Sequence, residues 1–124
     1  MNRDQTYAND QINSILAATL PQWALQGDHI TRTFKTSGWK ATLMVVNAVG
    51  HLAELAWHHP EIMVSYAAVD VRLQSHDVGG ITDRDFELAR KIEEFVSWRP
   101  GAEEGALTGI PEGKPHFAYI KHED

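Results

Sequence analysis

One long helical stretch lies between two pairs of strand-like segments. Residues 39–57 contain no proline, and apolar side chains recur there at steps of three and four, which is typical of an amphipathic helix. Ser37 is placed to cap its N-terminus, and Pro60 ends it, because the residue before a proline is disfavoured in the α region. The predicted buried stripe consists of Trp39, Leu43, Val46, Gly50, Ala53 and Trp57.

Two pairs of strand-like segments flank this helix. The predicted strands are residues 23–26, 29–36, 62–66 and 69–76. Gly27-Asp28 is a two-residue hairpin turn between the first pair, and Ala67-Ala68 is a short turn between the second. In the last strand apolar and polar residues alternate, which places His76 on the polar face at the strand's end.

Two further helices complete the predicted order α-β-β-α-β-β-α. Residues 9–20 form the first helix, and Thr82 with Asp85 resembles a capping box that opens the last one. We predict an α+β fold with a four-stranded antiparallel sheet and three helices packed on one face. Residues 1–96 would form this domain. Residues 97–124 would be an irregular Pro/Gly-rich tail of the same domain, with residues 117–120 docking on its body.

Composition excludes several classes of function. A formal net charge of −6 argues against nucleic-acid binding, which depends on phosphate neutralisation. No apolar run approaches the roughly 20 residues that span a bilayer, and the polar N-terminus lacks a signal-peptide core, so we expect a cytoplasmic protein without a membrane partner. The absence of cysteine excludes disulfides, thiolate catalysis and cysteine-ligated metals.

The seven histidines provide the candidate chemistry. Glu54 and His58 are four residues apart and share a helix face, His59 follows directly, and His76 ends a strand. These residue types suit general acid–base catalysis near neutral pH without a covalent intermediate.

Each candidate also has a structural explanation. A histidine at a helix C-terminus complements the helix dipole, and Glu54 can be a solvated surface residue. Asp85 can serve only as the capping-box partner, and Trp23 can be a core aromatic. A metal is a further alternative, since His51, Glu54 and His58 lie on roughly one face, but the spacing is not His-Glu-x-x-His, and we expect neither metal nor cofactor.

The combined spacing points to one family. The sequence reads Glu54-x3-His58-His59-Pro60-x5-Tyr66-x9-His76-x8-Asp85, and this pattern resembles the signature of the pterin-4a-carbinolamine dehydratases. The resemblance covers roughly residues 10–96 and includes the context Ser75-His76-Asp77-Val78-Gly79-Gly80-Ile81-Thr82.

The resemblance implies a lyase that dehydrates 4a-hydroxytetrahydropterin to quinonoid dihydropterin in tetrahydrobiopterin recycling. It implies that His58 and His76 are the acid–base pair and that His59 binds and orients the substrate. Glu54, Asp85 and Trp23 would contact or support the pterin. It leaves open which histidine is the acid and which is the base.

The resemblance also implies partners. We expect a homodimer or homotetramer, and an aromatic amino-acid hydroxylase as a possible pathway partner. The alternative is a non-catalytic binding or assembly factor on the same scaffold, such as a RuBisCO assembly factor. Assembly-type relatives tend to lose the histidine set, which this chain keeps.

Overall fold

The computed structural model describes residues 2–102 and 104–122, and the predicted order of elements is present. The helices are α1 (Asn9–Thr19), α2 (Trp39–Ala56) and α3 (Asp83–Val96), and a 3₁₀ turn covers Pro115–Phe117. The strands are β1 (Ala24–Gln26), β2 (His29–Thr36), β3 (Glu61–Ser65), β4 (Ala68–Leu73) and β5 (Ile120–Lys121).

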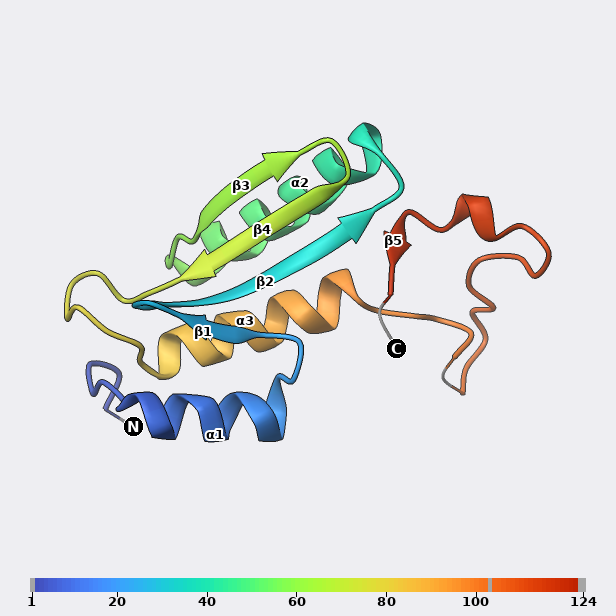
Figure 1. Cartoon of the computed structure of the whole chain (residues 1–124). Coiled ribbons are helices and arrows are strands. Elements are labelled where there is room, and N and C mark those ends of the chain that lie inside the picture. Colours follow the sequence, from blue (N-terminus) through green and yellow to red (C-terminus); the bar gives the residue numbers. More distant parts are fainter. Residues whose placement is uncertain (1, 103, 123–124) are drawn as a thin grey trace.

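All strand pairs in the sheet are antiparallel, and the main order is β1-β2-β4-β3. Ile30 of β2 faces Leu73 of β4, and Val71 of β4 faces Ile62 of β3. The short strand β5 adds to β2, so the sheet has five strands within the described residues instead of the predicted four. The α+β prediction is confirmed, and Figure 1 shows α2 and α3 behind the sheet with α1 near β1.

The core lies between the helices and one face of the sheet. Alternation along β2 and β4 sends every second side chain inward, as a half-buried sheet requires. The apolar inward residues of these two strands are Ile30, Phe34, Val69, Val71 and Leu73, and each is at most 1% exposed. They meet Ile12 and Leu16 of α1, Val45 and Val49 of α2, and Phe86, Ala89 and Ile92 of α3.

The predicted buried stripe of α2 is wrong for most of its members. The residues that α2 buries are Ala41, Thr42, Val45, Val49 and Ala53. Trp39 and Trp57 are instead 49% and 75% exposed. Apolar residues occur all around this helix, so periodicity alone cannot select a face, and the structure turns its smaller side chains toward the sheet. Ser37 is not the N-cap either, because Gly38 holds that position without a side-chain hydrogen bond.

Gly38 meets a steric requirement at the start of α2. Its φ is +154°, and a β carbon there would lie 3.3 Å from Oη of Tyr66. Glycine allows this close approach of the chain to the tyrosine ring. Tyr66, the one aromatic residue of the spaced pattern, therefore packs near the N-terminal end of α2, away from the histidines at its other end.

The second hairpin also differs in detail from its prediction. The turn between β3 and β4 is Tyr66-Ala67 rather than Ala67-Ala68, and β4 ends at Leu73. His76 therefore lies beyond the strand, in the turn that precedes the isolated bridge partner Gly80. A residue in such a turn has no strand partner to fix its side chain.

The described part of the tail joins the body through β5. Lys35 and Thr36 of β2 pair with Lys121 and Ile120, and Ser37 N–H donates to the carbonyl of Tyr119 at 3.0 Å. Ile120 is buried, whereas Phe117 remains exposed, so only the end of the predicted segment docks. Residues 103, 123 and 124 of the predicted tail lie outside the described residues. No helix in the described ranges is both long and apolar enough to cross a membrane.

Candidate active site

The chain around the C-terminus of α2 sends two consecutive histidines to different partners. Trp57 adopts a left-handed conformation with φ 51°, and its N–H reaches the carbonyls of Ala53 and Glu54. A non-glycine residue in this region is uncommon and carries some backbone strain. Pro60 then keeps the chain extended into β3. As a result His58 reaches α3, while His59 stays beside α2.

His58 is bonded to a fully buried carboxylate. Its Nε2 lies 2.7 Å from Oδ1 of Asp85, and the two side chains are 12% and 0% exposed. A carboxylate only accepts hydrogen bonds, so Nε2–H donates and the neutral ring keeps its lone pair on Nδ1. Nδ1 has no hydrogen-bond partner among the described residues and is not a buried atom. The pair leaves one imidazole nitrogen ready to accept a proton.

The second oxygen of Asp85 holds the start of α3. Oδ2 accepts from the backbone N–H of Thr82 at 2.9 Å and from Oγ of Ser75 at 2.8 Å. Ser75 also contacts Oγ1 of Thr82 at 2.8 Å, and all three residues are buried. The predicted capping box is therefore present, and the same carboxylate reaches His58 as well. The capping role of Asp85 is therefore confirmed, and its role at the substrate stays a prediction.

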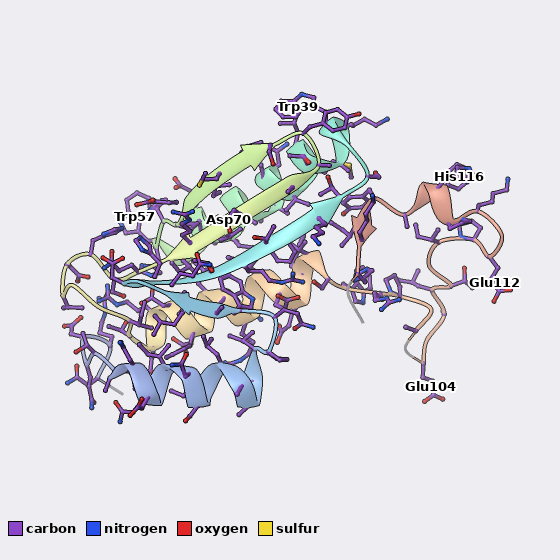
Figure 2. All side chains as sticks on the ribbon, in the orientation of Figure 1. Trp39, Trp57, Asp70, Glu104, Glu112 and His116 are labelled. Carbon is purple, nitrogen blue, oxygen red and sulfur yellow. The ribbon has the colours of Figure 1, made fainter. Side chains whose placement is uncertain are left out.

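His59 forms an exposed pair with Glu54. Its Nε2 lies 2.9 Å from Oε1 of Glu54, and about half of the His59 side chain is exposed. The Trp57 ring packs edge-on against the imidazole with centroids 4.9 Å apart. Figure 2 shows Trp57 at the end of α2 near the start of β3. This pair presents a polar, solvent-accessible surface beside the buried His58–Asp85 pair.

His76 lies at the same end of the sheet but does not bond to the other predicted residues. Its ring is exposed and has no hydrogen bond within the described parts of the chain. Its neighbour Ser75 donates to Asp85, so one carboxylate connects the backbone near His76 with the His58 ring. Its ring lies edge-on to that of His29, with the centroids 6.4 Å apart.

Trp23 lies in the core, at the other end of α3 from Asp85. It is 3% exposed, and its Nε1–H donates to Oε1 of Glu93 at 2.8 Å. Glu93 is eight residues beyond Asp85, about 12 Å along a helix. The structure thus joins Trp23 to Glu93, and it shows no bond or ring contact between Trp23 and the described histidines.

Glu93 accepts hydrogen bonds from several residues and so forms the centre of this second polar cluster. It accepts from Nε of Arg32 at 2.8 Å and from Oγ of Ser97 at 2.6 Å, in addition to Trp23. Burial alone would raise the pKa of Glu93, but the hydrogen bonds and the Arg32 charge outweigh it and lower that pKa. The cluster favours an ionised, structural carboxylate.

The alternative metal set of His51, Glu54 and His58 is not assembled. Glu54 turns to His59 and His58 turns to Asp85, so the potential ligands diverge. Within the part of the chain that the structure describes, no three or more His, Asp or Glu side chains are arranged to hold a metal ion.

Sequence reasoning missed the two hydroxyl groups that support Asp85. Ser75 was visible only as context next to His76, and Thr82 only as a helix cap. The capping box carried the signal, since a capping carboxylate commits one oxygen and leaves the other free for a partner.

Comparison with known proteins identifies the family of the chain. The family model described as pterin 4 alpha carbinolamine dehydratase matches residues 5–95. The chain belongs to the pterin 4 alpha carbinolamine dehydratase family.

Two bacterial relatives are similar to this chain over most of their own length. The chain is 48% identical over 77 residues to a protein of Aquifex aeolicus named "Putative pterin-4-alpha-carbinolamine dehydratase", covering 62% of this chain and 78% of that one. It is 40% identical over 89 residues to a protein of the same name in Thermomicrobium roseum, covering 72% and 96%.

A solved structure shows the same fold. It is the crystal structure of a protein from Brucella melitensis named "transcriptional coactivator/pterin dehydratase", and it aligns with a TM-score of 0.67 at 30% identity. The alignment covers 74% of this chain and 99% of that one. Together with the family match beginning at residue 5 and ending at 95, this leaves the tail outside the shared part.

Proposed function

We propose that the protein dehydrates a 4a-hydroxytetrahydropterin to the quinonoid dihydropterin by histidine general acid–base catalysis. The observation that carries the proposal is the His58–Asp85 bond, in which a fully buried carboxylate fixes a histidine ring that keeps a small exposed part. Family membership supplies the pterin class of substrate. The cytoplasmic location and the place in tetrahydrobiopterin recycling stay predictions, as does a hydroxylase as pathway partner.

The reaction needs two coupled proton transfers. The C4a–O bond breaks and the hydroxide leaves with a proton as water, while a ring nitrogen of the substrate loses a proton. His58 accepts that proton at Nδ1, because Asp85 holds Nε2–H and stabilises the imidazolium that forms. His76, which is exposed and free of hydrogen bonds among the described residues, donates to the leaving oxygen.

His59 and Glu54 bind and orient the pterin in this proposal. Their pair is exposed next to His58, and its carboxylate and imidazole can hydrogen-bond the N–H groups and the carbonyl of a pterin. Asp85 acts through His58 as a positioning residue. Trp23 stays a predicted substrate-binding residue, to be tested separately from its core contacts.

The decisive experiment is dehydration of freshly generated 4a-hydroxytetrahydropterin, followed by ultraviolet absorbance. We expect the parent protein to accelerate it, and His58→Ala and His76→Ala to lower kcat by roughly 100-fold or more with the fold intact. The matched control is His51→Ala, an exposed histidine on the same helix, which should leave kcat unchanged. Well-folded parent protein that gives no acceleration over the uncatalysed reaction would refute the proposal.

A second candidate is a binding role on the same scaffold. The name of the Brucella protein includes a transcriptional coactivator beside the dehydratase. In this chain the tail is the element that such a role would use, because it lies outside the family match and exposes Leu107, Ile110 and Phe117. An inactive but folded parent protein would direct attention to that segment.

We also propose that the protein is a homo-oligomer. Strand β3 is at the edge of the sheet, and it exposes Met63 and Val64. An unpaired, apolar edge strand is a template for pairing with a second chain.

A further inference from the structure

His29 is a partly buried histidine that the proposed reaction does not use. It is the first residue of β2, directly after the Gly27-Asp28 turn, and its side chain is only 19% exposed. The next residue, Ile30, pairs with Leu73, so the start of β2 lies beside the end of β4, where the chain continues to His76. The sheet register therefore brings His29 to the candidate active site.

The two ring nitrogens of His29 have very different surroundings. Nδ1 lies 2.5 Å from Oδ1 of Asp28, which fixes the plane of the ring. Nε2 is buried and makes no hydrogen bond, and the carboxylate of Glu61 is 3.8 Å away, beyond bonding distance. Within the described chain it is the one buried side-chain nitrogen or oxygen without a partner.

An unpaired buried nitrogen costs stability, so hydrogen bonding alone does not explain a histidine here. What the ring does have is an aromatic neighbour. Its centroid lies 6.4 Å from that of His76, with the planes at 72°, which is an edge-to-face arrangement. This separation is within the range in which aromatic rings attract each other.

His76 needs such a neighbour. It lies in a turn, its side chain is exposed, and no hydrogen bond within the described residues restrains its ring. An exposed side chain in a turn changes rotamer freely, whereas a proton donor must meet the leaving oxygen in a fixed geometry. The His29 ring, anchored by Asp28, is the group placed to limit that motion.

We propose that His29 is a positioning residue that holds the His76 ring in its working orientation. The inference rests on the proposed dehydratase function for its kinetic consequence, but not for its structural one. His29 itself does not contact substrate and exchanges no proton in the reaction. Its contribution is a rigid aromatic surface.

Kinetics separate this role from catalysis and from folding. His29→Ala removes the ring, and we expect kcat to fall about tenfold with KM changed less than about twofold. His29→Phe keeps a ring against His76 and removes the unpaired nitrogen, and we expect it to restore kcat to within about threefold of the parent value. His51→Ala serves as the matched histidine control, with parent kinetics.

A spectroscopic measurement tests the same contact without activity. In protein with carbon-13-labelled histidine, the His76 ring signal is assigned from its loss in His76→Ala. In His29→Ala we expect this signal to shift and to sharpen, because the His76 ring rotates more freely. In His29→Phe the signal should keep a ring-current shift. The His58 and His59 signals should stay in place in both variants.

Three results would overturn the proposal. Parent kcat in folded His29→Ala would show that His76 needs no support. His29→Phe as slow as His29→Ala would show that the nitrogens, not the ring, matter. An unchanged His76 signal in His29→Ala would show that the rings do not interact. Should the parent protein lack dehydratase activity, the proposed function fails and the His76 signal alone decides the contact.

Discussion

Oδ1 of Asp85 in α3 and Nε2 of His58, which follows α2, lie 2.7 Å apart although the two residues are separated by 27 positions. The other oxygen of Asp85 caps α3 through Thr82. One buried carboxylate therefore links the end of α2 to the beginning of α3.

Asp85→Asn tests this link. The amide keeps the shape of the carboxylate, but an N–H₂ group at one position would face donors from Thr82 or His58. We expect kcat to fall by roughly 100-fold or more, since the His58 tautomer is no longer fixed, and stability to fall by about 2 kcal/mol. Steady-state kinetics and urea unfolding measure the two effects.

Ser75→Ala is the graded control for that prediction. It removes one of the donors to Oδ2 and leaves the His58 bond in place. We expect the free energy of unfolding to fall by about 1 kcal/mol and kcat to fall less than tenfold. Equal kinetic damage in both variants would argue against a specific role of the His58 contact.

His59→Ala tests substrate orientation. The exposed His59–Glu54 pair lies beside His58, so its loss should weaken binding more than chemistry. We expect KM to rise about tenfold with kcat reduced less than threefold, and Glu54→Gln to show a smaller rise. A collapse of kcat at unchanged KM would instead place His59 in the proton-transfer step.

Glu93 makes stability depend on acid pH. Its pKa is lowered in the folded protein, because hydrogen bonds from Arg32, Ser97 and Trp23 outweigh the opposing effect of burial. A lowered folded-state pKa gives stability that is complete above the pKa of the unfolded chain and is lost as pH falls through the folded value.

The comparison for this prediction is Glu93→Gln. We expect the free energy of unfolding of the parent protein to exceed that of this variant by about 1–2 kcal/mol at pH 7. This difference should shrink below about pH 4. Chemical denaturation across pH 3 to 7 measures it. A difference that stays constant over that range would show that the Glu93 charge does not contribute.

Trp23→Phe separates core packing from substrate contact. Phenylalanine keeps an aromatic ring in the core but is smaller than tryptophan, and the indole N–H that donates to Glu93 is lost. We expect the free energy of unfolding to fall by about 1 kcal/mol. KM is then measured at a temperature well below the unfolding transition to test substrate contact. A raised KM supports Trp23 as a substrate-binding residue, and an unchanged KM assigns it to the core.

Strand β3 offers a test of assembly. Met63 and Val64 are exposed at the sheet edge, and lysine at both positions places charge where a second chain would pair. Light scattering should give the parent protein a mass at least twice the 13.9 kDa of one chain and the double variant a lower mass. A parent protein that is monomeric at all concentrations contradicts the oligomer.

Local signals predicted most of the fold. The strand-like segment after the Gly27-Asp28 turn predicted the bounds of β2, and the Thr82–Asp85 box predicted the start of α3. Both are decided by neighbouring residues. The buried face of α2 was mistaken because its apolar residues surround the helix, so the choice depends on fit against the sheet, which sequence periodicity does not contain.

Long-range contacts explain what else escaped prediction. Strand β5 has only two residues, and its pairing with β2 is decided by where the tail returns. His29 carries no spacing signal, because its nearness to His76 follows from the β2–β4 register. The spaced histidine pattern did indicate residues at one end of the sheet, but it also included Tyr66, which packs against Gly38.

The attachment of the tail at β5 has a consequence for variation. Helix α2 has 18 residues, about 27 Å, and it separates the β5 junction at its N-terminal end from the histidines at its C-terminal end. Figure 2 labels Trp39 and Trp57 at these opposite ends. Segments of new length or composition can therefore be added, exchanged or bound at one end of the molecule while the proposed proton-transfer groups at the other end keep their spacing.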